Sequence, residues 1–242
     1  MRDEVFSGVS NPKPFSFDEH IVDFFDDMLG RSIPYYSEVQ RMAVELTQHI
    51  LNGNGGTVYD IGCSTGNTLL RLKGSIPSEQ NVNLVGIDPS RAMCEKFAKK
   101  LSDAGSPGRI RILECGAEDI DSFPDARVVL MLFTLQFLDL PHRDCVLQKV
   151  YNSLADEGGV VIGEKIHADD PEMDAIYTGF YQAYKMRNGY SQEEIENKKK
   201  ALENVLAPRR NSENRRSLES VGFRRVDEVF RWYNFSVFLA LK

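Results

Sequence analysis

Residues 58–66 read Val-Tyr-Asp-Ile-Gly-Cys-Ser-Thr-Gly, a short apolar run with an acid near its end, followed by a glycine-rich turn. A buried parallel strand that feeds a helix requires this pattern, because glycine lets the backbone turn sharply and approach a ligand closely. A second apolar run, at residues 84–88, ends in Asp88. An acid at the end of the next strand is the usual partner of a ribose diol. The two runs together indicate a nucleoside-cofactor site.

The spacing of the glycines narrows the kind of ligand. After Gly62 the next glycine is Gly66, so the turn lacks the GxGxxG spacing of a dinucleotide site, and no lysine follows to make a phosphate-binding P-loop. A pyrophosphate is therefore a poor candidate. The alternative is a Rossmann-like strand and turn without a ligand, which is disfavoured because such turns sit at the carboxyl ends of strands, where ligands bind.

Composition is that of one enzyme-sized domain spanning residues 1–242, with 42% hydrophobic and 27% charged residues. The formal net charge of -7 disfavours a broad phosphate-binding surface, so we expect no direct nucleic-acid partner. The four cysteines lack CxxC spacing, which predicts reduced thiols and no metal site. No apolar run has the length of a bilayer span or the form of a signal peptide, so we expect a cytoplasmic protein without a membrane partner.

Strand and helix patterns alternate through the middle of the chain, which predicts an α/β fold with a mostly parallel sheet and helices on both faces. The expected strands cover residues 57–61, 83–88, 109–114, 127–133 and 158–164, and the expected helices cover residues 66–73, 90–103, 141–153 and 214–221. Two aromatic runs, at 223–232 and 235–241, predict a C-terminal antiparallel hairpin that completes a seven-stranded sheet.

The segments outside this alternation are expected to be helical. Helices at 17–28 and 35–51 would form an N-terminal cover made of residues 1–55. The charged helical stretch at 171–210 lies in an insertion, residues 168–212, that has too few apolar residues to bury a core alone and is expected to form a lid or a dimer element. Its aromatic residues repeat at helical spacing, which favours core or homodimer packing over a substrate site; they are Tyr177, Phe180, Tyr181 and Tyr184.

The D-x-G-x-x-x-G run and Asp88 resemble motif I and the following acidic site of class I S-adenosylmethionine (SAM)-dependent methyltransferases. The resemblance implies their Rossmann-like fold, with SAM or its demethylated product SAH as cofactor. It also implies that the glycine turn passes under the methionine part, that Asp88 holds the ribose, and that residues after the third strand flank the adenine. The cofactor-binding residues expected on this basis are Asp60, Gly62, Cys63, Ser64, Gly66, Asp88, Pro89, Ala117 and Glu118.

Further motifs along nearly the whole chain resemble those of the carboxy-S-adenosylmethionine (carboxy-SAM) synthase family. They are RSIPYYS at 31–37, FTLQFL at 133–138, GEK at 163–165, RNGYS at 187–191, ALENV at 201–205 and YNF at 233–235. This resemblance implies that SAM is joined with the carboxyl group of prephenate, that phenylpyruvate is released, and that the product serves tRNA wobble-uridine modification. It also implies that Tyr36 covers the cofactor.

Two positions depart from that family. Its carboxylate-gripping arginine falls on Lys199, which keeps the charge but loses the planar bidentate fork. Its cofactor-contacting asparagine falls on Leu132, beside Phe133, and leucine cannot hydrogen-bond. We still expect positions 132 and 133 at the cofactor. From this register Lys199 is expected to face the cofactor pocket and is a candidate catalytic residue. Tyr181, Tyr184 and Tyr190 are further candidates, because their segment is expected over the strand ends.

These two departures determine how we rank the functional hypotheses. Methyl transfer from SAM to a small-molecule acceptor ranks first, because a sulfonium needs mainly an acceptor held in line with the methyl carbon and water excluded. Carboxy-SAM synthesis ranks close behind, with carboxy-SAM as the alternative ligand. A non-catalytic SAM-binding protein is a distant third.

Overall fold

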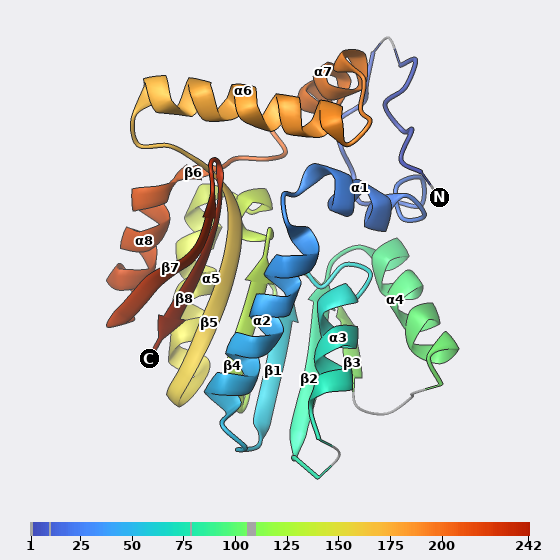
Figure 1. Cartoon of the computed structure of the whole chain (residues 1–242). Helices are drawn as coiled ribbons and strands as arrows, with labels where there is room; N and C mark the ends of the chain where they lie inside the picture. Colours follow the sequence, from blue (N-terminus) through green and yellow to red (C-terminus); the bar gives the residue numbers. More distant parts are fainter. Residues whose placement is uncertain (1, 10, 78, 106–109) are drawn as a thin grey trace.

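The computed structural model describes residues 2–9, 11–77, 79–105 and 110–242, and the centre of this part of the chain is one sheet (Figure 1). The strands lie in the order β3-β2-β1-β4-β5-β8-β7. Strands β1 to β5 are parallel, and β8 is antiparallel to both of its neighbours. Their bounds are β1 Gly56–Ile61, β2 Val82–Asp88, β3 Ile110–Glu114, β4 Ala126–Leu132, β5 Leu154–His167, β7 Arg225–Trp232 and β8 Phe235–Leu241. The predicted seven-stranded, mostly parallel sheet with its antiparallel hairpin is confirmed.

The sheet differs from the expectation in its details. A short strand that the sequence did not predict, β6 Arg209–Arg210, pairs in parallel with Ile166 and His167 at the end of β5. Strand β5 also begins at Leu154, earlier than expected. Residue 109, where the third strand was expected to begin, lies outside the described residues. A two-residue strand carries no periodicity, so the sequence has no signal for β6.

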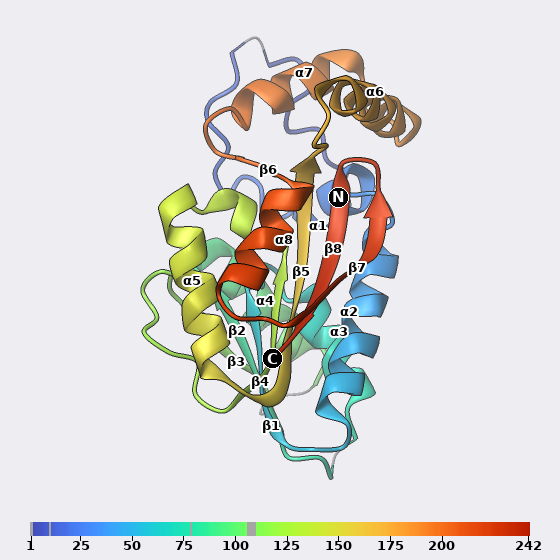
Figure 2. The ribbon, with the colours of Figure 1, turned by 90° about the vertical axis from the view of Figure 1, so that its left-hand side faces the viewer.

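Helices cover both faces of the sheet, as predicted. One face carries α2 Tyr36–Leu51, α3 Asn67–Ser75 and α4 Arg91–Asp103, and the other carries α5 Leu140–Ser153 and α8 Asn211–Ser220 (Figure 2). Buried apolar side chains such as Val39 and Phe97 pack on the first face. Others such as Val146 and Leu218 pack on the second. The two helical layers leave β1, β2 and β4 buried along nearly their whole length, and most of their residues are apolar.

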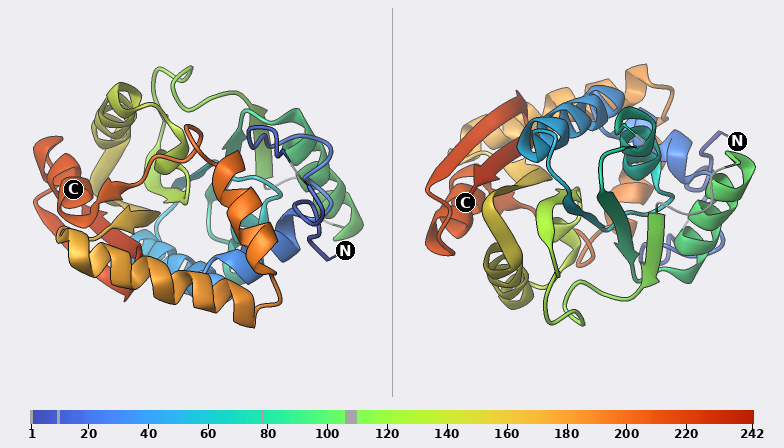
Figure 3. Two further views of the ribbon diagram at one scale, coloured as in Figure 1. Left: turned by 90° about the horizontal axis from the view of Figure 1, so that it is seen from above. Right: turned by 90° about the horizontal axis from the view of Figure 1, so that it is seen from below.

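Three helices lie beyond the carboxyl ends of the parallel strands: α1 Phe25–Ser32, α6 Pro171–Arg187 and α7 Gln192–Ala201. Seen from above, α7 crosses over the middle of the molecule and α6 runs along one side (Figure 3). The stretch expected to be helical at 171–210 is therefore two helices. They separate where Gly189 adopts a φ of 85° and Ser191 caps α7.

The first expected helix begins later than predicted, at Phe25 in place of residue 17. Residues 18–24 form turns, in which the Asp18 side chain accepts the backbone N–H of His20 at 2.9 Å. An aspartate that binds the backbone two residues on competes with helix formation. Across the described ranges, no helix combines the length and apolar character needed to cross a membrane.

Candidate active site

A cavity of about 400 Å³ opens at the carboxyl ends of β1, β2 and β4, below α7 and the N-terminal segment, which we define as residues 2–9 and 11–24. Its wall includes all but one of the residues expected to bind the cofactor. These are Tyr36, Asp60, Gly62, Cys63, Ser64, Asp88, Pro89, Ala117, Glu118, Leu132 and Phe133. The exception is Gly66. The fold thus gathers residues from distant parts of the sequence around one space.

The glycine turn after β1 packs closely on its surroundings. The backbone N–H of Gly62 donates to the carbonyl of Ile87 at 2.8 Å. Gly62 has a φ of 73°, and a Cβ at this position would lie 2.4 Å from Oγ1 of Thr134. Gly66 has a φ of 78°, and a Cβ there would lie 2.0 Å from the ring of Phe97. Gly62 therefore shapes the cavity wall, whereas Gly66 allows the turn to pack against α4.

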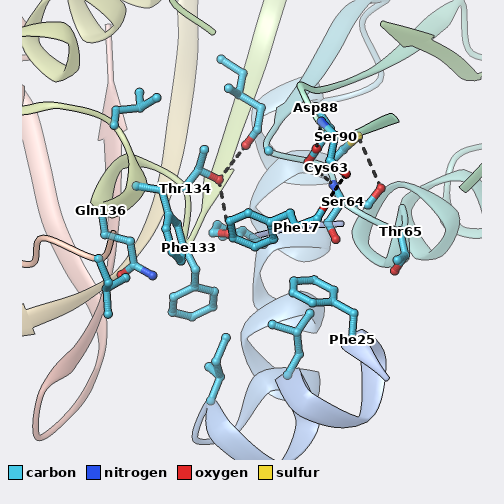
Figure 4. Close-up of a pocket in the computed structure, with 18 of the residues that line it drawn as sticks. Phe17, Phe25, Cys63, Ser64, Thr65, Asp88, Ser90, Phe133, Thr134 and Gln136 are labelled. Atoms are coloured by element: carbon cyan, nitrogen blue, oxygen red, sulfur yellow. Dashed lines mark hydrogen bonds between the residues drawn. The ribbon is translucent and has the colours of Figure 1, made fainter. Parts of the chain in front are cut away.

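Asp88, at the end of β2, is held by two backbone N–H groups. Ser64 donates to its Oδ2 and Ser90 to its Oδ1, each at 2.9 Å (Figure 4). Burial raises the pKa of this carboxyl group, and the two hydrogen bonds oppose that shift. Because each carboxylate oxygen can accept more than one hydrogen bond, Asp88 can still receive a pair of adjacent hydroxyl groups.

Asp60, near the end of β1, is 4% exposed and lines the same cavity. No hydrogen bond to its carboxyl group occurs within the described ranges. Burial, together with the neighbouring Asp88, raises its pKa to about 8. A cation in the cavity would favour the ionised carboxylate. Asp60 is therefore suited to a positively charged ligand.

The loop after β4, residues 133–136, forms another part of the wall (Figure 4). The carboxyl group of Glu164 accepts the backbone N–H of Leu135 at 3.0 Å, and the side-chain oxygen of Gln136 accepts the backbone N–H of Lys165 at 2.7 Å. Burial raises the pKa of Glu164 to about 8. Both supporting side chains lie in motifs quoted above, but neither was identified as part of the site from the sequence.

Tyr36, at the start of α2, closes one side of the cavity. Its hydroxyl accepts a hydrogen bond from Nε2 of Gln40 at 3.2 Å, and the same amide donates to Oγ1 of Thr68 at 3.3 Å. The Tyr36 ring lies 6.4 Å from that of Phe133. Burial raises the pKa of Tyr36, which keeps it neutral. Its position matches the expected cover over a ligand.

Two lysines bring positive charge to the wall: Lys165 from β5 and Lys198 from α7. The Lys198 ammonium group donates to Oγ of Ser32 at 2.9 Å and lies 3.9 Å from the carboxylate of Asp3. Among the described residues no carboxylate lies within ion-pair distance of Lys165, whose Nζ is 5.3 Å from the centre of the Tyr181 ring. Burial lowers the pKa of both lysines, that of Lys198 to about 8.

Lys199, which was expected to face the cavity, does not line it; its neighbour Lys198 does. Successive residues of an α-helix point about 100° apart. Helix α7 turns Ile195 and Lys198 inward, three residues apart, and leaves Lys199 exposed. The family resemblance implied a cation at position 199, but it could not show which lysine of the run at 198–200 faces inward.

Tyr184 and Tyr190, the other candidate catalytic residues, also lie outside the cavity wall. The ring of Tyr184 packs against Trp232, 5.2 Å between centres. Tyr190 is buried, and its hydroxyl donates to Oδ2 of Asp3 at 2.5 Å. Tyr181, the candidate one helical turn before Tyr184, does line the cavity.

Comparison with known proteins identifies the family. A family described as "Methyltransferase domain" matches residues 58–158. The carboxy-S-adenosyl-L-methionine synthase of Wolinella succinogenes is 40% identical over 242 residues, covering 100% of this chain and 99% of that protein. The synthase of the same name from Helicobacter pylori (strain HPAG1) is 42% identical over 245 residues, covering 100% of both.

Solved structures share the fold at low sequence identity. A protein from Methanococcus maripaludis described as a "putative s-adenosyl-l-methionine-dependent methyltransferase" superposes with a TM-score of 0.62, 19% identity and 97% of each chain covered. Human N-acetylserotonin methyltransferase in complex with SAM gives a TM-score of 0.61, 14% identity, and covers 92% of this chain and 55% of its own. The predicted Rossmann-like methyltransferase fold is thereby confirmed. Since identity of at least 40% to both synthases extends over its whole length, this chain belongs to the carboxy-S-adenosyl-L-methionine synthase family.

Proposed function

We propose that this protein is a SAM-dependent transferase that makes carboxy-SAM. The observation that carries the proposal is the charge pattern of the cavity: Asp60 and Asp88 come from β1 and β2, and Lys165 and Lys198 come from β5 and α7. The acids suit the sulfonium, ammonium and ribose groups of SAM, and the lysines suit carboxylates on a second substrate. A neutral methyl acceptor would leave these two desolvated ammonium groups without an anionic partner.

The residues present fit SAM. Asp88 can receive the ribose hydroxyls, Asp60 can face the positive charge, and the turn at Gly62 allows a close backbone approach. Ala117 and Glu118 are proposed to flank the adenine. Bound SAM supplies a methyl group activated by the sulfonium, and the protein has to orient the second substrate against it and exclude water.

Prephenate, the donor implied by the family, carries two carboxylates, which match the two lysines of the wall. The overall change balances without a further reactant. One C–H bond of the SAM methyl group is replaced by a C–C bond to the carboxyl carbon. The donor loses that carboxyl group together with a hydroxide, which combines with the methyl proton to give water. Phenylpyruvate is the remaining product.

Methyl transfer to a small-molecule acceptor is the second candidate, and one observation favours it. Much of the wall is apolar and aromatic, including Phe15, Phe17, Phe133 and Phe137, and Leu132 lies among them. Such a wall can receive an apolar acceptor. The lysines reverse the order in which the sequence ranked these two reactions, and the SAM site is common to both.

Mass spectrometry separates the two reactions. The protein is incubated with SAM and prephenate, and the products are compared with those of a Lys165→Gln variant. We expect carboxy-SAM, heavier than SAM by one carbon dioxide, and phenylpyruvate in equal amounts, with both strongly reduced in the variant. Absence of both products from a folded wild-type protein that binds SAM would contradict the proposal and return methyl transfer to first place.

The location of the enzyme, its lid and its oligomeric state are also proposals. We expect a cytoplasmic protein that works on small molecules. We propose that α6 and α7 act as a lid over the cavity and that the outer face of α6 forms a homodimer interface. Exposed apolar side chains on that face support the dimer, because a monomer rarely leaves such a cluster in water. They are Met173, Ile176 and Phe180.

A further inference from the structure

We propose that Asp3 is a specificity-determining residue of the cavity: it is a built-in counter-ion of Lys198, which an anionic second substrate has to displace. The inference rests on the proposed function, because it takes Lys198 as a receiver of a substrate carboxylate. It adds Asp3, from the far N-terminal part of the chain, as a residue that lowers the affinity of the site for anions.

The burial of Asp3 is the first observation. Its side chain is 1% exposed, although it lies at the beginning of the chain. A buried carboxylate is costly unless it is paired and hydrogen-bonded. Here the partners of the carboxylate are the hydroxyl of Tyr190, which donates at 2.5 Å, the backbone N–H of Val5, which donates at 3.3 Å, and the ammonium group of Lys198 at 3.9 Å. Asp3 therefore depends on a cation that also lines the cavity.

The geometry of this pair is the second observation. An N–O distance of 3.9 Å is longer than a direct hydrogen bond, and Lys198 donates at 2.9 Å to Oγ of Ser32 instead. An ammonium group has three donors, so one or two can still be offered to a ligand. A substrate carboxylate at hydrogen-bond distance would bind Lys198 more strongly than Asp3 does. The two carboxylates would then repel each other across one ammonium group.

The backbone contacts of Asp3 show that its side chain can move away from Lys198 while the N-terminal segment stays in place. Its backbone N–H donates to Asp27 at 2.7 Å, and its carbonyl accepts from the guanidinium of Arg31 at 2.9 Å. These backbone contacts do not use the carboxylate. Displacement of the side chain from Lys198 therefore leaves the segment tethered to α1.

The same segment covers the cavity. Phe15 and Phe17 line it, and the backbone N–H of Phe15 donates to the carbonyl of Ala201 in α7 at 2.8 Å. In Figure 4 the ring of Phe17 is seen between Thr134 and Ser64. Binding of an anion at Lys198 would thus loosen a contact that holds the cover closed. Arrival of the second substrate and mobility of the cover become linked through Asp3.

The test compares the affinities of SAM and carboxy-SAM, two ligands that differ by one carboxylate. Calorimetry on Asp3→Asn is expected to show carboxy-SAM binding strengthened by at least about fivefold, because a like charge beside Lys198 is removed. SAM binding should change less than about twofold, because SAM brings no extra carboxylate to this lysine. Glu4→Gln is the control: it removes the same charge from an exposed neighbour and should change neither affinity.

An unchanged or weaker affinity of Asp3→Asn for carboxy-SAM would overturn the inference. Hydrogen exchange on the wild type gives a second measurement that needs no variant. Adding carboxy-SAM to the SAM-free protein should speed exchange in residues 2–9 relative to adding SAM, and equal or slower exchange would also overturn it. Neither readout needs turnover. If the protein forms carboxy-SAM but Asp3→Asn binds it with unchanged affinity, only this inference fails. If the protein forms no carboxy-SAM but the affinity rises in Asp3→Asn as expected, only the proposed function fails.

Discussion

At the scale of single residues, Asp88 gives the most direct prediction for the cofactor site. Replacing it with alanine removes the proposed acceptor of the ribose diol while leaving β2 in place. We expect the affinity for SAH to fall by about 1.5 to 3 kcal/mol, the range for a hydrogen bond to a charged group. Calorimetry measures it, and Glu114→Ala is the control, because Glu114 occupies the matching position of β3 but is exposed. Equal affinities in folded Asp88→Ala and wild type would sink the assignment.

Asp60 predicts a pH dependence of stability. Its pKa in the folded protein is about 8, against an ordinary value of 3.8. Between these values the folded protein keeps a proton that the unfolded chain has released. The contribution to the free energy of unfolding is therefore fully present below about pH 4 and lost as the pH rises through about 8. Urea unfolding of the ligand-free protein should show stability falling with pH more steeply in wild type than in Asp60→Asn. Asp88 titrates in both proteins, so identical slopes would contradict the shift assigned to Asp60.

At the scale of elements, α7 shows how a cap can support the site. The hydroxyl of Ser191 accepts the N–H of Glu194 at 3.1 Å, and the carboxylate of Glu194 accepts the N–H of Ser191 at 2.7 Å. Ser191→Ala is expected to lower the free energy of unfolding by about 1 kcal/mol. Chemical denaturation checks it against Ser102→Ala in α4, where alanine favours the helix. A loss no larger than that of the control would show that the cap does not stabilise α7.

The elements that could be predicted from the sequence are those with a strong period or a long apolar run. The strands ending at Ile61 and Asp88 were recognisable because burial on both faces requires continuous apolar residues. The start of α1 was not, because the local bonding of Asp18 competes with a helical pattern. The break between α6 and α7 was also missed, since the left-handed Gly189 lies inside a stretch whose charges suit one long helix.

The same contrast holds for the site when the whole molecule is considered. Its cofactor half could be predicted because Gly62 and Asp88 belong to short motifs at adjacent strand ends. Its cationic half could not, because Lys165 and Lys198 come from separate elements and meet only after α7 folds over the sheet. Nothing in the local sequence of Asp3 distinguishes it from an exposed acid, and its burial depends entirely on tertiary contacts.

The assembly of the whole molecule gives a further prediction, which concerns the outer face of α6. Phe180 is exposed there and packs 5.0 Å from the ring of Tyr233. If this face joins two copies, Phe180→Glu places a charge in a self-complementary apolar contact and should shift the protein toward monomers. Light scattering measures the mass. Leu140→Glu, at an equally exposed leucine on α5, should leave the dimer intact. A wild type that is already monomeric would remove the basis for the interface.

Strand β8 occupies an interior place in the sheet although it is the last strand along the chain, with β5 on one side and β7 on the other. During synthesis on the ribosome, one edge of β5 therefore stays unpaired until β8 has been made. Strand β7 also leaves the exit tunnel before β8, the strand with which it pairs. The unpaired edge of β5 includes Val160 and Ile162, both buried in the finished sheet. An unpaired apolar edge is a template for wrong pairing between nascent chains. This edge thus closes only once residues 235–241 have been translated and have paired with β5, and a chaperone that binds apolar segments is of most use to the nascent chain before that point.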